Sequence, residues 1–69
     1  MKPSWDEAPE WANWLAQDED GSWWWYEDKP KLNLDIWWGW DRMMPVFGKK
    51  EFTPNWRETL EQRPVEEVE

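Results

Sequence analysis

Tryptophan gives this chain its clearest capacity for chemistry, and that chemistry is non-covalent binding. Six of the ten tryptophans stand in two clusters, the runs Trp23-Trp24-Trp25 and Trp37-Trp38-Gly39-Trp40. Indole rings stack on flat ligands and bury large apolar areas, and exposed tryptophans are enriched at the energetic centres of protein interfaces. The candidate binding residues are therefore Trp23, Trp24, Trp25, Trp37, Trp38 and Trp40.

The remaining residue types argue against catalysis. The chain has no histidine and no cysteine, which removes the commonest general base, the thiolate nucleophile and the usual ligands of zinc. The acidic run Asp18-Glu19-Asp20 offers carboxylate oxygens, but an EF-hand loop beginning at Asp18 needs glutamate at its twelfth position, where Lys29 stands. We therefore assign no catalytic residue, no cofactor and no metal site, and we predict that the protein is not an enzyme.

The charge balance indicates which partners such a protein could bind. Sixteen carboxylates stand against eight lysines and arginines, a net charge of −8. Direct binding to nucleic acid or to an anionic membrane needs a positive surface, so neither is expected. An indole cluster with an acidic rim suits a basic protein surface. Carboxylates gathered on one face could also mimic a nucleic-acid backbone, but here basic residues are interspersed among them.

A small ligand is the alternative partner. A nucleobase or a cyclic nucleotide could stack between indoles, and a sugar could stack in the same way. The phosphate of a nucleotide would then meet one of four lysines: Lys29, Lys31, Lys49 or Lys50.

The tryptophans also have a structural explanation. Leu, Ile, Val and Phe occupy only ten of 69 positions, and a chain of this length buries only about 60% of its unfolded surface. Each indole can bury roughly 150–250 Å², so the tryptophans must supply most of the core. The functional question is which of the six candidate rings reach solvent. We expect one domain, residues 1–64, followed by a short acidic tail, residues 65–69.

The N-terminal segment predicts a short helix. Ser4 and Glu7 have the spacing of a capping box, and Pro9 suits a first helical turn. An apolar stripe at helical spacing follows, formed by Ala8, Trp11, Ala12 and Leu15. We expect a helix from about residue 8 to residue 14 or 16. In the alternative interpretation, residues 14–17 form the first strand of a hairpin that turns at Asp20-Gly21.

Three further segments predict strands. Residues 22–27 carry aromatic side chains on both faces, so this strand is either central and covered on two sides or presents one aromatic face to a partner. Residues 34–40 follow, and Gly39 marks a bulge or a place where another ring lies against the backbone. One face of that strand carries Leu34, Ile36, Trp38 and Trp40. Residues 43–47 predict an edge strand, because Pro45 cannot donate to a central ladder.

A second short helix is expected near the C-terminus. Thr53 or Asn55 could cap it, Trp56 and Leu60 would share its apolar side, and Pro64 would end it. The predicted fold class is α+β: an antiparallel meander of three or four strands with short N- and C-terminal helices.

Three segments together resemble a group of small, tryptophan-rich acidic proteins of tailed bacteriophages and prophages. They are Trp5-Asp6-Glu7-Ala8-Pro9-Glu10-Trp11-Ala12, Leu15-Ala16-Gln17-Asp18-Glu19-Asp20-Gly21-Ser22-Trp23-Trp24-Trp25-Tyr26-Glu27 and Trp56-Arg57-Glu58-Thr59-Leu60-Glu61-Gln62-Arg63-Pro64. The resemblance covers more than half of the chain. It implies a phage origin and expression in a bacterial cell, and it assigns no functional residue.

Together with the aromatic clusters, this resemblance predicts a phage accessory protein that inhibits a host or anti-phage defence protein by stoichiometric binding. The alternatives are a sponge that sequesters a cyclic nucleotide signal and a minor structural or assembly component of the phage. Pairing of two copies would also cover an aromatic sheet face, so a homodimer is a further option. The sequence shows neither a signal peptide nor a membrane-spanning run, and the expected location is the cytoplasm of the bacterial host.

Overall fold

The computed structural model describes residues 2–65, which form strands and single helical turns. The two 3-10 turns are η1 (Trp5–Glu7) and η2 (Trp56–Glu58). The six strands are β1 (Trp14–Gln17), β2 (Ser22–Tyr26), β3 (Lys31–Asn33), β4 (Ile36–Trp38), β5 (Met43–Lys50) and β6 (Glu61–Gln62).

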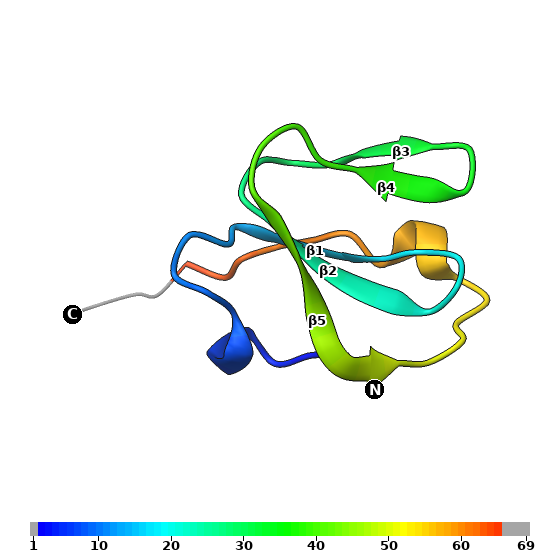
Figure 1. The fold of residues 1–69 in the computed structure, drawn as a ribbon, viewed down its shortest axis with the longest axis horizontal. Helices are drawn as coiled ribbons and strands as arrows, with labels where there is room; N and C mark the ends of the chain where they lie inside the picture. The colour runs from blue at the N-terminus through cyan, green and yellow to red at the C-terminus, as the bar shows by residue number, and fades with distance from the viewer. Residues whose placement is uncertain (1, 66–69) are drawn as a thin grey trace.

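The strands form two antiparallel sheets in separate layers. Four of them pair in the order β5-β2-β1-β6, while β3 and β4 form a hairpin of their own. In Figure 1 this hairpin lies above the larger sheet, and η2 lies on the same side of that sheet as the hairpin. The N-terminal segment with η1 lies below the sheet. Covers on both sides therefore enclose the four-stranded sheet.

The predicted N-terminal helix is wrong, although its capping box is present. The Ser4 hydroxyl accepts a hydrogen bond from the Asp6 amide, and the Glu7 carboxylate accepts one from the Ser4 amide. The box caps only one 3-10 turn, because Pro9 disfavours helical backbone at the preceding residue and Ala8 is extended, with φ −73° and ψ 141°. The alternative interpretation of residues 14–17 as a strand is correct, and β1 pairs with β2 across the turn.

The predicted C-terminal helix is also wrong, because pairing with β1 takes over after one turn. The side chain of Asn55 makes no capping hydrogen bond to η2. The hydroxyl of Thr59 accepts a hydrogen bond from the backbone amide of Gln17 at 2.8 Å. The chain then continues as β6 along the edge of β1, where Glu61 lies opposite Leu15.

The α+β meander is corrected to a mostly β fold with a separate hairpin. The strand expected over residues 34–40 is shorter, because Leu34 and Asp35 form the hairpin turn. The expectation that a ring lies against Gly39 is confirmed: a Cβ there would stand 2.7 Å from a ring carbon of Tyr26. β5 occupies the sheet edge, as Pro45 predicted.

Aromatic residues fill both faces of the larger sheet. On the side of the N-terminal segment, Ala12, Leu15, Trp23 and Trp25 form one buried cluster, and Trp5 and Trp11 pack against it. On the hairpin side, Ala16, Tyr26, Trp37 and Trp56 form a second one, joined by Trp14 and Trp24. Strand β2 is thus central and covered on two sides. Of the predicted acidic tail, residues 66–69 lie outside the described residues.

Arg63 ties the C-terminal segment to the N-terminal one. Its guanidinium donates to the carbonyl oxygens of Pro9, at 3.0 Å, and Ala12, at 2.7 Å, and lies 5.6 Å from the centre of the Trp5 ring. These contacts join residues more than fifty positions apart, so they hold the two terminal segments together.

We expect Arg63→Ala to lower the free energy of unfolding by about 1.5–3 kcal/mol, because hydrogen bonds from a charged donor are lost. Urea unfolding followed by tryptophan fluorescence measures the change. Arg42→Ala is the matched control, because Arg42 is exposed and its guanidinium lies 5.2 Å from the centre of the Trp11 ring, while its carbonyl, which accepts a hydrogen bond from the Glu27 amide, is kept in the variant. An equal loss in the two variants would contradict this role of Arg63.

Candidate functional site

The structure divides the six candidate tryptophans between the core and the surface. Trp23, Trp25 and Trp37 are buried, and Trp24 is half-buried. Trp38 and Trp40 are 47% and 59% exposed. Trp38 and Trp40 are the most exposed of the six rings, so the site that the structure supports is smaller than the sequence-based set.

Trp37 fixes the orientation of the hairpin. Its ring lies in the cluster with Tyr26 and Trp56, its amide donates to the Asp18 carboxylate at 2.9 Å, and its carbonyl accepts from the Tyr26 hydroxyl at 3.5 Å. Because neighbouring side chains on a strand point to opposite faces, burial of Trp37 turns Trp38 outward.

The outward face of the hairpin carries exposed apolar side chains on β4, opposite Lys31 and Asn33 of β3. Ile36 is exposed beside Trp38, and the rings of Trp38 and Trp40 meet edge to face, with centroids 4.6 Å apart. Lys31, opposite Trp38 in the register, places its ammonium 5.6 Å from the centre of the Trp40 ring. We call the four apolar residues of this face and its tip the hairpin surface: Leu34, Ile36, Trp38 and Trp40.

Leu34 stands out at the tip of the hairpin. It is 85% exposed and has φ 52°, in the left-handed region that favours glycine. The Arg57 guanidinium donates to its carbonyl oxygen at 3.3 Å, which helps hold this turn. A large apolar side chain is therefore presented to solvent from a backbone conformation that leucine rarely adopts. Sequence alternation had placed Leu34 and Ile36 on the face of Trp38, but the candidate site did not include them.

An acidic pocket lies between the hairpin tip and the β1–β2 turn. Its volume is about 430 Å³. Its lining combines four acidic residues with two apolar ones: Asp18, Glu19, Asp20, Asp35, Ile36 and Phe52. Ile36 belongs to both the pocket and the hairpin surface, so the two are continuous.

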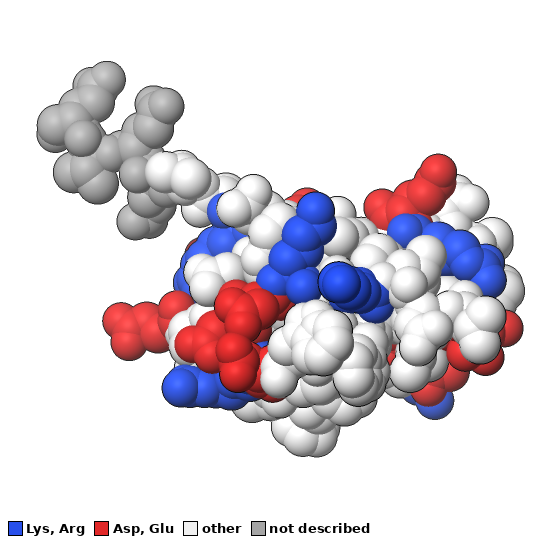
Figure 2. All heavy atoms as spheres, turned by 90° about the horizontal axis from the view of Figure 1, so that it is seen from above, with Lys and Arg blue, Asp and Glu red and all other residues white. Residues whose placement is uncertain are grey.

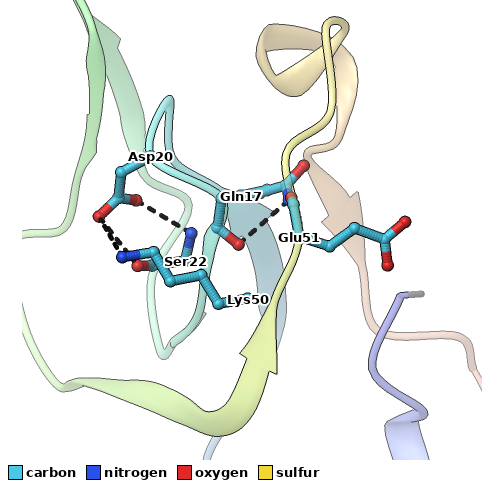
Figure 3. Close-up of polar contacts among 6 residues, drawn as sticks. Gln17, Asp20, Ser22, Lys50 and Glu51 are labelled. Carbon is cyan, nitrogen blue, oxygen red and sulfur yellow. Dashed lines mark hydrogen bonds and ion pairs between the residues drawn. The ribbon is translucent and has the colours of Figure 1, made fainter.

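The two aspartates of the β1–β2 turn differ in their surroundings, and Figure 3 shows those of Asp20. Asp20 accepts hydrogen bonds from the backbone and side chain of Ser22 and lies 3.8 Å from the Lys50 ammonium; the bond from the Ser22 amide contributes most to lowering its pKa. Burial raises the pKa of Asp18, and the charges of Asp20 and Asp35 act in the same direction, against the hydrogen bond from Trp37. The ionised form of Asp18 is therefore disfavoured in the folded protein.

A buried amide and a glycine hold this turn in place. The Gln17 side chain donates to the carbonyl oxygens of Gly21 and Glu51, and the latter bond joins the turn to the segment after β5 (Figure 3). Gly21 has φ 95°, and a Cβ there would stand 2.8 Å from the Glu51 carbonyl oxygen. Only glycine fits so close to the backbone of Glu51. The acidic turn therefore has a fixed position under the hairpin tip.

Carboxylates also stand at the other end of the hairpin surface. A hydrogen bond from the protonated Asp28 carboxyl to Asp41 raises the pKa of Asp28, and Asp41 directly follows Trp40. Figure 2, which looks onto the hairpin side of the molecule, shows an uncharged area with acidic side chains toward both ends and basic ones beside it.

The four lysines proposed for phosphate binding do not form a single site. Lys29 lies 5.4 Å from the centre of the Trp14 ring, and Lys31 lies over Trp40. Lys49 and Lys50 instead line a groove of about 420 Å³ beside β5, with Trp24 and Phe47 among its other walls. The exposed indole pair and the β5 lysines thus belong to different surfaces.

The described residues, 2–65, contain no group of three or more acidic side chains arranged to hold a metal ion. No helix in this part of the chain is long and apolar enough to cross a membrane. No protein-family model matches the chain, and neither a curated protein nor a solved structure shows significant similarity to it. The case for function therefore depends on the geometry.

Substitution of Asp18 separates its charge from its hydrogen bond. Asp18→Asn retains an oxygen acceptor for the Trp37 amide without the buried charge, so we expect it to be at least as stable as the original chain at pH 7. Asp18→Ala leaves that amide without its partner and should cost about 1–3 kcal/mol. Thermal or urea unfolding measures both.

The pH dependence provides the check on this interpretation. A raised native-state pKa means that ionisation of Asp18 lowers stability as pH rises through its pKa values. Any advantage of Asp18→Asn should therefore be present at pH 7 and disappear below about pH 3, where the original carboxyl is protonated in both states. An advantage that persists at low pH would contradict the assigned cause.

Proposed function

We propose that this protein is a phage accessory protein that binds a host or anti-phage defence protein in stoichiometric amounts and inhibits it through the hairpin surface. The observation that carries the proposal is the outward-facing pair Trp38 and Trp40, held in place by the buried ring of Trp37. The phage origin rests on the sequence resemblance alone.

The hairpin surface has the character of an interface centre. Tryptophan is enriched among residues whose truncation weakens protein complexes most, and contiguous exposed apolar residues mark interaction sites. The core already contains the rings of Trp25, Trp37 and Trp56, so Trp38 and Trp40 are not required to fill it. Binding is the explanation that accounts for their exposure.

The nucleotide sponge has weaker support. Trp38 and Trp40 meet edge to face at an interplanar angle of 69°, so no parallel slot for a base lies between them. The groove beside β5 favours this alternative most, because it combines Trp24 and Phe47 with two lysines. A saturable fluorescence change with cyclic dinucleotides that is lost in Phe47→Ala would favour the sponge.

We expect Trp38→Ala and Trp40→Ala each to weaken partner binding by about tenfold or more while leaving the fold intact. The partner is first captured from bacterial lysate on the full chain, and its dissociation constant is then measured by calorimetry with each purified variant.

Phe47→Ala is the matched control, because Phe47 is an aromatic residue that is 82% exposed outside the hairpin surface. It should bind the partner as tightly as the original chain. Unchanged binding by both tryptophan variants, or equal weakening by Phe47→Ala, would contradict the proposed site. Failure to capture any specific protein would count against the inhibitor function itself.

A further inference from the structure

The hairpin surface continues into the acidic pocket, and this continuity limits the chemistry of a partner. Ile36 faces both, and Asp35 at the hairpin turn lies across the pocket from the β1–β2 turn. A segment lying on Trp38 and Trp40 would therefore meet carboxylates at its end. Asp28 and Asp41 stand beyond the opposite end of the surface.

The pocket carboxylates are poorly compensated by the chain itself. Among the described residues, the ion pair recorded at this pocket joins Asp20 to Lys50 at 3.8 Å, and both side chains are largely exposed. Such a pair in water contributes little binding energy. Burial together with the charges of Asp20 and Asp35 already makes the ionised form of Asp18 costly, so a cation from outside would relieve this repulsion.

The apolar walls of the pocket select among cations. Ile36 and Phe52 are both exposed, and they lie in the same pocket as the four acidic side chains. An arginine side chain has an apolar stem for such walls and a planar, weakly hydrated guanidinium that stacks on aromatic rings and binds carboxylates with two parallel hydrogen bonds. A hydrated metal ion or a lysine ammonium would use the ring of Phe52 less well.

We propose that the hairpin surface docks a protein segment of the partner whose arginine side chain enters the pocket between the β1–β2 turn and the hairpin tip. The inference rests on the proposed binding function and adds the chemistry of the partner. Charge complementarity is the argument for this occupant. A second copy of the chain would bring another net charge of −8 against the same carboxylates, which disfavours self-association through this face.

The test uses the full, 15N-labelled protein at low salt and two tripeptide probes. One is acetyl-Ala-Arg-Ala-amide, and the other carries citrulline, which has nearly the same shape without the charge, in place of arginine. Heteronuclear NMR spectra record which amides shift. The arginine peptide should produce saturable shifts at residues 18–20, 35, 36 and 52, and the citrulline peptide should leave them unchanged.

Two charge-neutralising variants distinguish the pocket from general attraction. Asp35→Asn should weaken binding of the arginine peptide by about threefold or more, since one of the four carboxylates is lost. Glu10→Gln is the matched control, because Glu10 is exposed and lies before β1, whereas the pocket turn follows β1. It should leave the dissociation constant unchanged.

Equal binding of the two peptides, shifts spread over acidic residues outside the pocket, or equal weakening by the two variants would overturn the arginine site. These results are separable from failure of the proposed function. If Trp38→Ala abolishes binding of a captured partner while the arginine peptide shifts no amide signal of the pocket, the binding function is supported and the arginine site is contradicted. If the arginine peptide binds the pocket as described and no protein is captured, the site stands without the inhibitor function.

Discussion

Burial of the Trp37 ring is the constraint on which the exposed surface depends. The ring joins the β3–β4 hairpin to the larger sheet by packing with Tyr26 and Trp56, and both backbone polar groups of Trp37 are engaged, by Asp18 and by the Tyr26 hydroxyl. Because side chains alternate along a strand, this single anchor decides that Ile36 and Trp38 face outward. The same contact brings the hairpin tip over the β1–β2 turn, so the apolar surface and the acidic pocket form together.

The aromatic core explains how so short a chain can hold this arrangement. Aliphatic residues are few, and the two buried clusters on either face of the sheet are built largely from indoles. Polar contacts then fix the ends of the strands: Gln17 holds the turn to the segment after β5, and Arg63 joins the two terminal segments. The indole N–H groups of Trp23 and Trp37 are buried without a hydrogen-bond partner in the described part of the chain. Burying these two N–H groups without a partner costs free energy, and the large apolar area that the rings bury offsets this cost.

The sequence predicted local features better than their assembly. The capping box and the Asp-Gly turn depend on neighbouring residues, and both are present. Pro45 and Gly39 predicted an edge strand and a closely approaching ring, but not the partners, which are β2 and Tyr26. The predicted N-terminal helix does not form because Pro9 keeps Ala8 extended. The predicted C-terminal helix ends after one turn because Glu61 pairs with Leu15 at the edge of β1, far away in the sequence. The same limit applies to the site. Alternation placed Trp37 opposite Trp38, but only the packing of Tyr26 and Trp56 shows which of them is buried.

The division of the ten tryptophans between core and surface can be measured directly. In a heteronuclear NMR spectrum each indole N–H gives its own signal, and a neutral soluble paramagnetic agent broadens each signal according to its access to solvent. This division predicts that the signals of Trp38 and Trp40 are broadened most, and those of Trp23, Trp25, Trp37 and Trp56 least. Strong broadening of Trp37, or protection of Trp38 and Trp40 equal to that of the buried rings, would contradict it.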